Sequence, residues 1–335
     1  PGMAGIRLCL GWSTIATMIL TQLTNGVAIG ARKGLQWPSD RLRTTYSSCH
    51  VLPWRLTRAA FKNFVSYASR KDKSKTPSLH RLPRLFVEKN LSIGDYINFD
   101  SIQSNYLASV MRLKQGSYCL VFDGVNGEFQ ARIETADKRE TTAVVERESR
   151  PPPVTPIGGP VLIFSPLKSK SRMQFLVEKA TELGVGSLVP AKMRRTEVTK
   201  INVEKTRRHA VEAAEQCERL TVPIIHDMQD LSDILADWPP ECPLFCCIER
   251  TTNEGLADEM LAHRDPTSKL SASFGLMVGP EGGYHDEERD TLMNHPAVIS
   301  VSLGENILRA ETAAIAGLSV MRMCGGVGDR KDGGG

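Results

Sequence analysis

Two segments near the C-terminus combine glycines with charged side chains. The first, 279–283, reads Gly-Pro-Glu-Gly-Gly and follows the apolar run 274–278, which is typical of a buried strand. Glycines let backbone amides approach a ligand closely because no side chain stands in the way. Ligands of parallel α/β sheets bind at the carboxyl ends of the strands, so 279–283 is a candidate binding loop. A plain tight turn is the alternative interpretation of this motif taken alone.

The second segment, 303–313, reads Leu-Gly-Glu-Asn-Ile-Leu-Arg-Ala-Glu-Thr-Ala and follows another apolar run, 298–303. Arg309 and Glu311 stand where a helix is expected to begin, and each alone could be an ordinary charge at a helix end. That account does not explain why two such loops close two successive strands. The dinucleotide and P-loop glycine fingerprints are missing, so neither nicotinamide nor ATP is favoured as the ligand.

Strands and helices alternate in the second half of the chain, which favours an α/β domain with a largely parallel sheet. The apolar patterns predict strands at 161–164, 188–190, 243–248, 274–278 and 298–303, and helices at 171–184, 203–219 and 308–321. The first helix has the best-marked ends, because Ser171 and Gln174 could form a capping box and Gly184 is placed as a C-terminal cap.

Short strand-like segments and tight turns characterise residues 80–149. Asp123-Gly124 and Asn126-Gly127 are typical of turns between short strands. We therefore predict a small β-rich, barrel-like domain over 80–149. The proline-rich stretch 150–160 cannot continue a helix or sheet and is predicted to link it to the α/β domain at 161–324.

Positive charge is concentrated in residues 1–79, which hold twelve Lys and Arg against two acidic residues, a net charge of +10. Residues 80–335 hold 30 basic and 36 acidic residues, a net charge of −6. A basic segment rich in Ser, Thr and Arg is typical of an organellar transit peptide, which predicts import into a plastid or mitochondrion. The alternative is a basic arm that stays attached and contacts RNA phosphates in a cytoplasmic protein. The glycine-rich stretch 325–335 is predicted to be a disordered tail.

The composition is that of an ordinary globular enzyme, with 41% hydrophobic and 24% charged residues. No stretch is long and apolar enough for a membrane span, so no membrane partner is expected. The eight cysteines form no paired CxxC motif, and we expect no metal site. Cys246 and Cys247 lie in an apolar run and are interpreted as packing residues of a buried strand.

Four motifs, taken together and in their order along the chain, indicate a protein family more specifically than any one of them does. They are EKATELGV at 178–185, EAAEQC at 212–217, GPEGG at 279–283 and LGENILRAETA at 303–313. In this order they resemble the RsmE family of ribosomal RNA uridine N3-methyltransferases, of the SPOUT superfamily, over about residues 80–323. The resemblance implies a SPOUT-type trefoil-knotted parallel sheet behind an N-terminal PUA-like β-barrel that binds RNA. It also implies S-adenosylmethionine as cofactor, small-subunit ribosomal RNA as partner, and a homodimer with shared active sites.

The same resemblance implies roles for individual residues. Cofactor contacts are implied at Gly279, Glu281, Gly282, Gly283, Leu303, Gly304, Ile307, Leu308 and Thr312. RNA contacts are implied at Arg195, Arg219 and Arg112. Arg309 and Glu311 match polar positions beside the reaction centre. Because uridine N3 carries a weakly acidic proton, Glu311 could accept it directly or through water, and Arg309 could stabilise the developing oxyanion.

Two residues depart from the family pattern without touching the glycine loops. Glu218 stands where a glycine is usual, and His285 stands where a small capping residue is commoner. Two other functions stay open: a non-catalytic RNA-binding factor in ribosome assembly, and the same chemistry on a different RNA. The intact glycine loops favour a cofactor-binding enzyme, because a scaffold would not need them.

Overall fold

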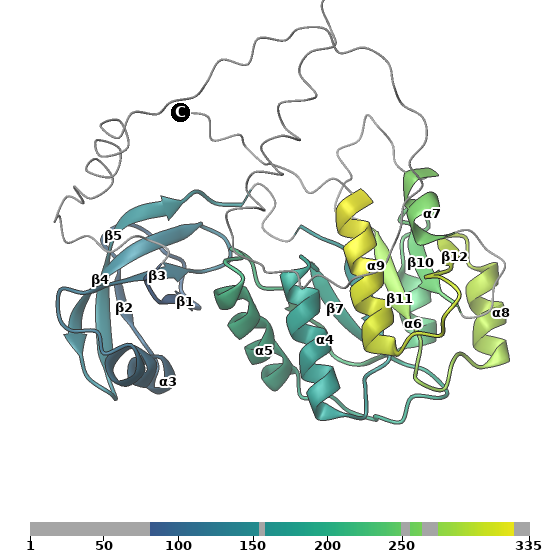
Figure 1. Ribbon diagram of the computed structural model, residues 1–335, viewed down its shortest axis with the longest axis horizontal. Helices are drawn as coiled ribbons and strands as arrows, with labels where there is room; N and C mark the ends of the chain where they lie inside the picture. Colours follow the sequence, from purple (N-terminus) through teal and green to yellow (C-terminus); the bar gives the residue numbers. More distant parts are fainter. Residues whose placement is uncertain (1–80, 154–157, 249–254, 263–273, 325–335) are drawn as a thin grey trace, which may run out of the picture. The chain divides into compact units, whose positions relative to one another are not determined.

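The computed structural model describes residues 81–153, 158–248, 255–262 and 274–324 (Figure 1). The predicted leader at 1–79 and the predicted tail at 325–335 lie outside the described residues, as does part of the predicted linker. None of the helices within these described ranges is both long enough and apolar enough to cross a membrane.

The N-terminal part of the described chain forms a five-stranded sheet. Its strands are β1 (Arg84–Phe86), β2 (Tyr96–Asn98), β3 (Tyr118–Phe122), β4 (Glu128–Ala136) and β5 (Thr141–Arg150). They lie in the order β1-β3-β4-β5-β2, with β1 parallel to β3 and the other neighbours antiparallel. Val121, Ala131 and Ile133 are wholly buried in the core beneath this sheet. The predicted β-rich structure of this part of the chain is confirmed, whereas its extent as a separate domain stays a prediction.

A short helical segment lies between β2 and β3, and the sequence pattern does not predict it. It consists of α3 (Ser101–Asn105) and a π-helical turn (Tyr106–Val110). Asp100 caps α3, because its side chain accepts a hydrogen bond from the backbone N–H of Gln103 at 2.7 Å. Leu107 is fully buried in the core of the sheet. A five-residue helix is too short to display a helical period, which explains why it escapes prediction.

A parallel sheet occupies the C-terminal part. Its strands are β6 (Val161–Phe164), β7 (Ser187–Lys192), β8 (Ile224–Ile225), β9 (Gln229–Asp230), β10 (Leu244–Cys247), β11 (Gly275–Val278) and β12 (Val298–Val301). The order is β12-β10-β11-β6-β7-β8, with β9 beside β7, and all these neighbours are parallel. The predicted α/β architecture is confirmed, while the threading of a trefoil knot stays a prediction.

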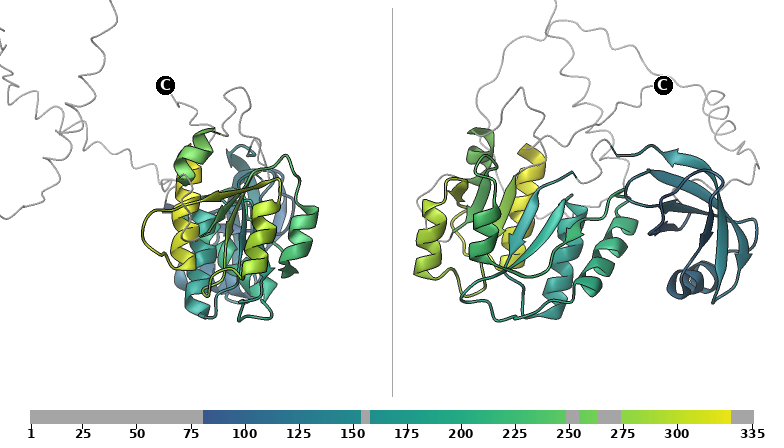
Figure 2. Two further views of the ribbon diagram at one scale, coloured as in Figure 1. Left: turned by 90° about the vertical axis from the view of Figure 1, so that its right-hand side faces the viewer. Right: turned by 180° about the vertical axis from the view of Figure 1, so that it is seen from behind.

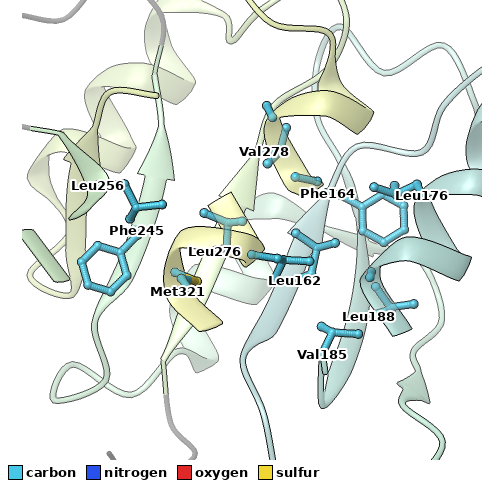
Figure 3. Packing of buried hydrophobic residues seen from close by; sticks show 14 of the residues in the cluster. Leu162, Phe164, Leu176, Val185, Leu188, Phe245, Leu256, Leu276, Val278 and Met321 are labelled. Carbon is cyan, nitrogen blue, oxygen red and sulfur yellow. The ribbon is translucent and has the colours of Figure 1, made fainter. Parts of the chain in front are cut away.

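Helices cover both faces of this sheet (Figures 1 and 2). The described helices are α4 (Lys170–Glu182), α5 (Val203–Gln216), α6 (Leu231–Asp237), α7 (Leu256–Ala262), α8 (Asp286–Asn294) and α9 (Ala310–Cys324). Leu276 and Val278 of β11 pack in the core that holds α4 and α9, which Figure 3 shows from close by. Met277, between them, faces the core of α6 and α8. The central strands are therefore sealed by apolar packing on both faces.

The start of α4 differs from the prediction. Its N-cap is Ser169, whose hydroxyl accepts a hydrogen bond from the backbone N–H of Arg172 at 3.5 Å. Ser171 lies inside the first turn, so the predicted capping box of Ser171 and Gln174 is wrong. The physical reason is that Ser169 has the extended backbone an N-cap requires. At the other end, the predicted cap is confirmed, because Gly184 has a φ of +91°.

A strained turn follows α5, which ends at Gln216 rather than near residue 219. Glu218 has a φ of +59°, in the left-handed region that costs a residue with a side chain about 1–2 kcal/mol. Its carbonyl accepts a hydrogen bond from Nη1 of Arg150 at 2.9 Å, which holds the turn in place. This backbone explains why a glycine is expected at this position.

A buried arginine connects β1 to the end of α5. Arg84 is only 9% exposed, and its Nε donates to Glu128 at 2.5 Å. Its Nη1 and Nη2 donate to the carbonyls of Ala214 and Arg219 at 2.7 and 2.6 Å. The guanidinium also lies 3.7 Å from the centre of the Phe122 ring. Burial lowers the pKa of Arg84, and Glu128 opposes this effect. Four partners therefore hold one desolvated charge.

We expect Glu218→Gly to stabilise the protein by about 0.5–1 kcal/mol, because glycine adopts the left-handed backbone without a steric cost. Thermal unfolding should show a melting temperature roughly 2 °C higher than that of the wild type. Glu212→Gly is the matched control: Glu212 is exposed within α5, where glycine should instead destabilise by about 1 kcal/mol. An unchanged or lower melting temperature for Glu218→Gly would contradict the assignment of strain.

Candidate active site

The two glycine-bearing loops meet at one edge of the parallel sheet. The loop at 279–283 follows β11, the loop at 302–309 follows β12, and β10 lies between these strands. Because the three strands are parallel, their carboxyl ends share an edge, and the outer two are about 10 Å apart at the usual strand spacing. A cavity of about 1100 Å³ is lined by both loops.

Most of the predicted cofactor residues line this cavity. They are Gly279, Glu281, Gly282, Gly283, Leu303, Gly304, Ile307 and Leu308. Arg309 also lines it, and its side chain is exposed. Glu311 and Thr312 are not among the described residues that form the cavity wall. Glu311 is buried in the first turn of α9, whereas Thr312 is exposed. The structure thus places most of the predicted site residues around one cavity and leaves Glu311 and Thr312 outside its wall.

Two positions of the first loop, Gly279 and Gly283, favour glycine for different structural reasons. A Cβ on Gly279 would lie 2.8 Å from the ring of Tyr284, which packs against it. Gly283 has a φ of +74°, which favours glycine. The Tyr284 hydroxyl lies 3.3 Å from Sγ of Cys246, and burial raises the pKa of both groups, that of Cys246 to about 12. Tyr284 is therefore a neutral packing residue that anchors the loop to β10.

Arg195 holds the first loop from the side. Its Nη1 donates to the carbonyl of Gly282 at 2.8 Å, and its side chain lines the cavity. The neighbouring Thr196 hydroxyl lies 2.8 Å from that of Ser165, at the end of β6. The segment with Arg195 is thereby fixed to the same edge of the sheet. The sequence predicts an RNA contact here, and the structure adds a contact with the candidate cofactor loop.

The second loop combines a special backbone with exposed apolar side chains. Gly304 has a φ of +111° with no atom near the position of a Cβ, so the backbone conformation, rather than close packing, favours glycine here. Ile307 is 62% exposed although it lines the cavity. Leu303 and Leu308 pack partly against the main core. This loop therefore offers an apolar wall for a flat ligand, next to the guanidinium of Arg309.

A charged cluster connects the first loop to the start of α9, and the sequence analysis did not identify its central residue, Arg172. Nη1 of Arg172, in the first turn of α4, forms an ion pair with the carboxylate of Glu281. The same nitrogen lies 3.6 Å from Oε2 of Glu311. Arg172 and Glu281 line the cavity. The signal for Arg172 was present in the sequence, since a cation in the first turn of a helix is disfavoured by the helix dipole.

The other two predicted RNA residues have different surroundings. Arg219 donates from Nη1 to the carbonyl of Thr181 at 2.9 Å and from Nε to the hydroxyl of Thr221 at 2.8 Å. Burial lowers the pKa of Arg219 to about 10. These contacts give Arg219 an intramolecular role at the C-terminal end of α4. Arg112 is exposed after the π-helical turn, with a φ of +53°.

His285 caps a helix, at a position where the family resemblance leads us to expect a small capping residue. It is the N-cap of α8, and its ring nitrogen accepts from the backbone N–H of Glu287 at 3.4 Å. The carboxylate of Glu288 accepts from the backbone N–H of His285 at 3.0 Å, which completes a capping box. Glu288 also accepts from the backbone N–H of Arg194 at 2.6 Å. The end of the first loop and the segment with Arg195 are thus joined through the start of α8.

Two family models match this chain. Residues 156–322 match the RNA methyltransferase domain, and residues 102–146 match the RNA methyltransferase PUA domain. The first match contains both glycine-bearing loops, and the second lies within the N-terminal sheet.

Relatives and solved structures agree with these matches. The chain is 28% identical to the ribosomal RNA small subunit methyltransferase E of Rickettsia conorii, over 72% of this chain and 96% of that protein. It is 30% identical to the enzyme of that name from Synechocystis, over 73% of this chain and 82% of that protein.

A crystal structure of a ribosomal RNA small subunit methyltransferase E from Neisseria gonorrhoeae, bound to S-adenosyl methionine, has a TM-score of 0.61. It is 25% identical and covers 72% of this chain and 98% of its own. These similarities span both sheets and the edge where the two loops meet. This chain therefore belongs to the ribosomal RNA small subunit methyltransferase E family.

Proposed function

We propose that this protein transfers a methyl group from S-adenosylmethionine to N3 of a uridine in small-subunit ribosomal RNA. The observation that carries the proposal is the single cavity lined by both glycine-bearing loops. Its volume of about 1100 Å³ is sufficient for a nucleoside-sized ligand. The names of the relatives support the class of RNA, and the motif resemblance supports the uridine N3 atom.

The residues present fit this cofactor. Gly282, Gly283 and Gly304 carry no side chain that would keep a ligand away from the backbone of the two loops, so that backbone could bind the polar edges of an adenosine. The apolar wall with Ile307 could cover a flat ring, and the Glu281 carboxylate could face the positive charges of the methionine part. When it is bound, the cofactor supplies an electrophilic methyl group.

The chain's own residues would orient the uridine and manage its proton. Arg309 is exposed at the cavity, where its guanidinium could stabilise the negative charge that develops on the uracil oxygen. Glu311 could accept the N3 proton only through water or after a rearrangement, since its side chain is 8% exposed and is not part of the cavity wall. Positioning of the two reactants would supply much of the rate. The target base must be unpaired or extruded, because N3 lies on its pairing edge.

Depletion of this protein should remove 3-methyluridine from small-subunit ribosomal RNA, as measured by mass spectrometry of digested nucleosides. Wild-type protein should restore the modification, whereas Gly282→Val should not, because a β-branched side chain would obstruct the loop where the backbone meets the cofactor. Titration calorimetry should show a loss of S-adenosylmethionine affinity of at least about tenfold for the variant, or 1.4 kcal/mol.

The variant should still fold and bind RNA. A Cβ on Gly282 would lie 3.5 Å from Cδ of Arg195, an ordinary contact, and Gly282→Ala provides a milder control. Unchanged cofactor affinity in Gly282→Val would remove the first loop from the binding site. Retention of 3-methyluridine after depletion would favour a non-catalytic assembly factor, and loss from another RNA would identify a different substrate.

We also propose a homodimer. Met323 on α9 and Phe175 on α4 are 84% and 45% exposed, and these two helices pack against each other. The motif resemblance implies the dimer, and these two side chains are exposed apolar groups on α4 and α9 that a second chain could cover.

Light scattering should give twice the chain mass for the wild type, and the mass of one chain for the double variant Met323→Glu, Phe175→Glu. A carboxylate at each position would have to be desolvated on association, which disfavours the dimer. Met293→Glu is the matched control, because Met293 is also exposed but belongs to α8, on the other face of the sheet. A wild type that is a fully active monomer would exclude the shared site.

Residues 1–79 are proposed to direct import into a plastid or mitochondrion. Deletion of 1–79 should leave a protein that folds and binds S-adenosylmethionine. Both glycine-bearing loops and the described hydrophobic cores of the two sheets lie beyond residue 80. Calorimetry of the truncated protein measures its cofactor affinity, and thermal unfolding measures its stability. The cellular location of a fluorescent protein fused to 1–79 shows whether this segment directs import. A truncated protein without cofactor affinity would contradict the leader hypothesis, and a fusion that stays in the cytoplasm would favour an RNA-binding arm.

A further inference from the structure

Arg172 occupies a position where three segments of the chain converge. It belongs to α4, which follows β6, whereas Glu281 follows β11 and Glu311 begins α9 after β12. Its Nη1 contacts the carboxylates of both glutamates. One guanidinium group therefore contacts the first loop and the start of the helix that follows the second loop.

The location of Arg172 is unfavourable for the helix itself. The first turn of α4 contains no acidic residue, although carboxylates are favoured there and cations are disfavoured by up to about 1 kcal/mol. The two glutamates supply the missing negative charge from outside the helix. Arg172 is thus retained at a cost to α4 and gains its stabilisation from the cavity.

Glu311 contacts Arg172 but does not line the cavity. Its side chain is 8% exposed, and Oε2 has no hydrogen-bond partner among the described residues. A buried carboxylate oxygen in this state depends on a nearby cation, and Nη1 of Arg172 lies 3.6 Å away. Glu281, the other partner of the same nitrogen, lines the cavity. Arg172 therefore joins a buried carboxylate to a carboxylate in the cavity wall.

We propose that Arg172 is a positioning residue for cofactor binding, and that Glu311 acts through it. Glu311 holds the guanidinium of Arg172, and Arg172 holds the carboxylate of Glu281 at the cavity. These contacts fix the position of the Glu281 carboxylate at the cavity wall, on loops whose separation is set by the strands. The inference rests on the proposed function in one respect, since it takes S-adenosylmethionine to be the ligand of the cavity.

Removal of the guanidinium would leave the Glu281 and Glu311 carboxylates without their shared counter-ion. Like charges at close range repel, so the Glu281 carboxylate would turn toward solvent and lose its fixed position at the cavity wall. Neutralising Glu311 in the same protein would remove part of this repulsion. The effects of the two substitutions should therefore be coupled and not independent.

The test measures the dissociation constant of S-adenosylmethionine by calorimetry on the full chain. Arg172→Met should weaken binding about tenfold or more, and Arg172→Lys should weaken it less, because lysine keeps the charge. Glu311→Gln should weaken binding severalfold. The double variant Arg172→Met, Glu311→Gln should bind more tightly than Arg172→Met alone.

Lys170→Met is the control for loss of a cation in the first turn of α4. Lys170 is exposed and is not in the cavity wall, so cofactor affinity should not change. If Arg172→Met does not fold, the pair Glu281→Gln and Glu311→Gln tests the same coupling. Wild-type affinity in Arg172→Met, or effects of the two substitutions that simply multiply, would overturn the inference. A wild type that does not bind S-adenosylmethionine would instead contradict the proposed function.

Discussion

The position of β10 between β11 and β12 is the constraint on which the site depends. Parallel strands end at a common edge, and one intervening strand sets the distance between the two loops at about 10 Å. This distance cannot change easily, because Phe245 of β10 packs in one core and Cys246 in the other. The loops can therefore be glycine-rich and open without losing their separation. Rigid strands set the width of the cavity, and the loops supply its chemistry.

Charge balance at this edge is the second constraint. The edge carries Arg172, Arg195 and Arg309, and two of them already contact the first loop, one through the Glu281 carboxylate and one through the Gly282 carbonyl. Arg309, exposed on the second loop, is better placed to meet a substrate. Such a division is reasonable for an enzyme whose cofactor is cationic and whose substrate is anionic. Arg172 and Arg195 contact the first loop, and Arg309 is exposed where it can contact a substrate.

The two loops were predictable because their signals are local. An apolar run followed by glycines identifies a strand end and a binding loop within ten residues, and most of the residues expected at the cavity do line it. The link between Arg172 and Glu311 was not predictable, because it spans 139 positions and depends on the order of the strands. Ser169 and Ser171 show a smaller failure of the same kind. Both serines can cap a helix, and only the backbone conformation decides between them.

Glu218 and His285 show what a departure from a pattern can reveal. At both positions the resemblance leads one to expect a residue with a backbone role, and the structure has a left-handed turn at Glu218 and a helix N-cap at His285. The turn at Glu218 is kept despite its side chain, since Arg150 binds its carbonyl. The cap at His285 is kept because an imidazole nitrogen can accept the bond that a serine or aspartate would accept. In each case the surrounding fold determines the backbone, and the side chain conforms to it.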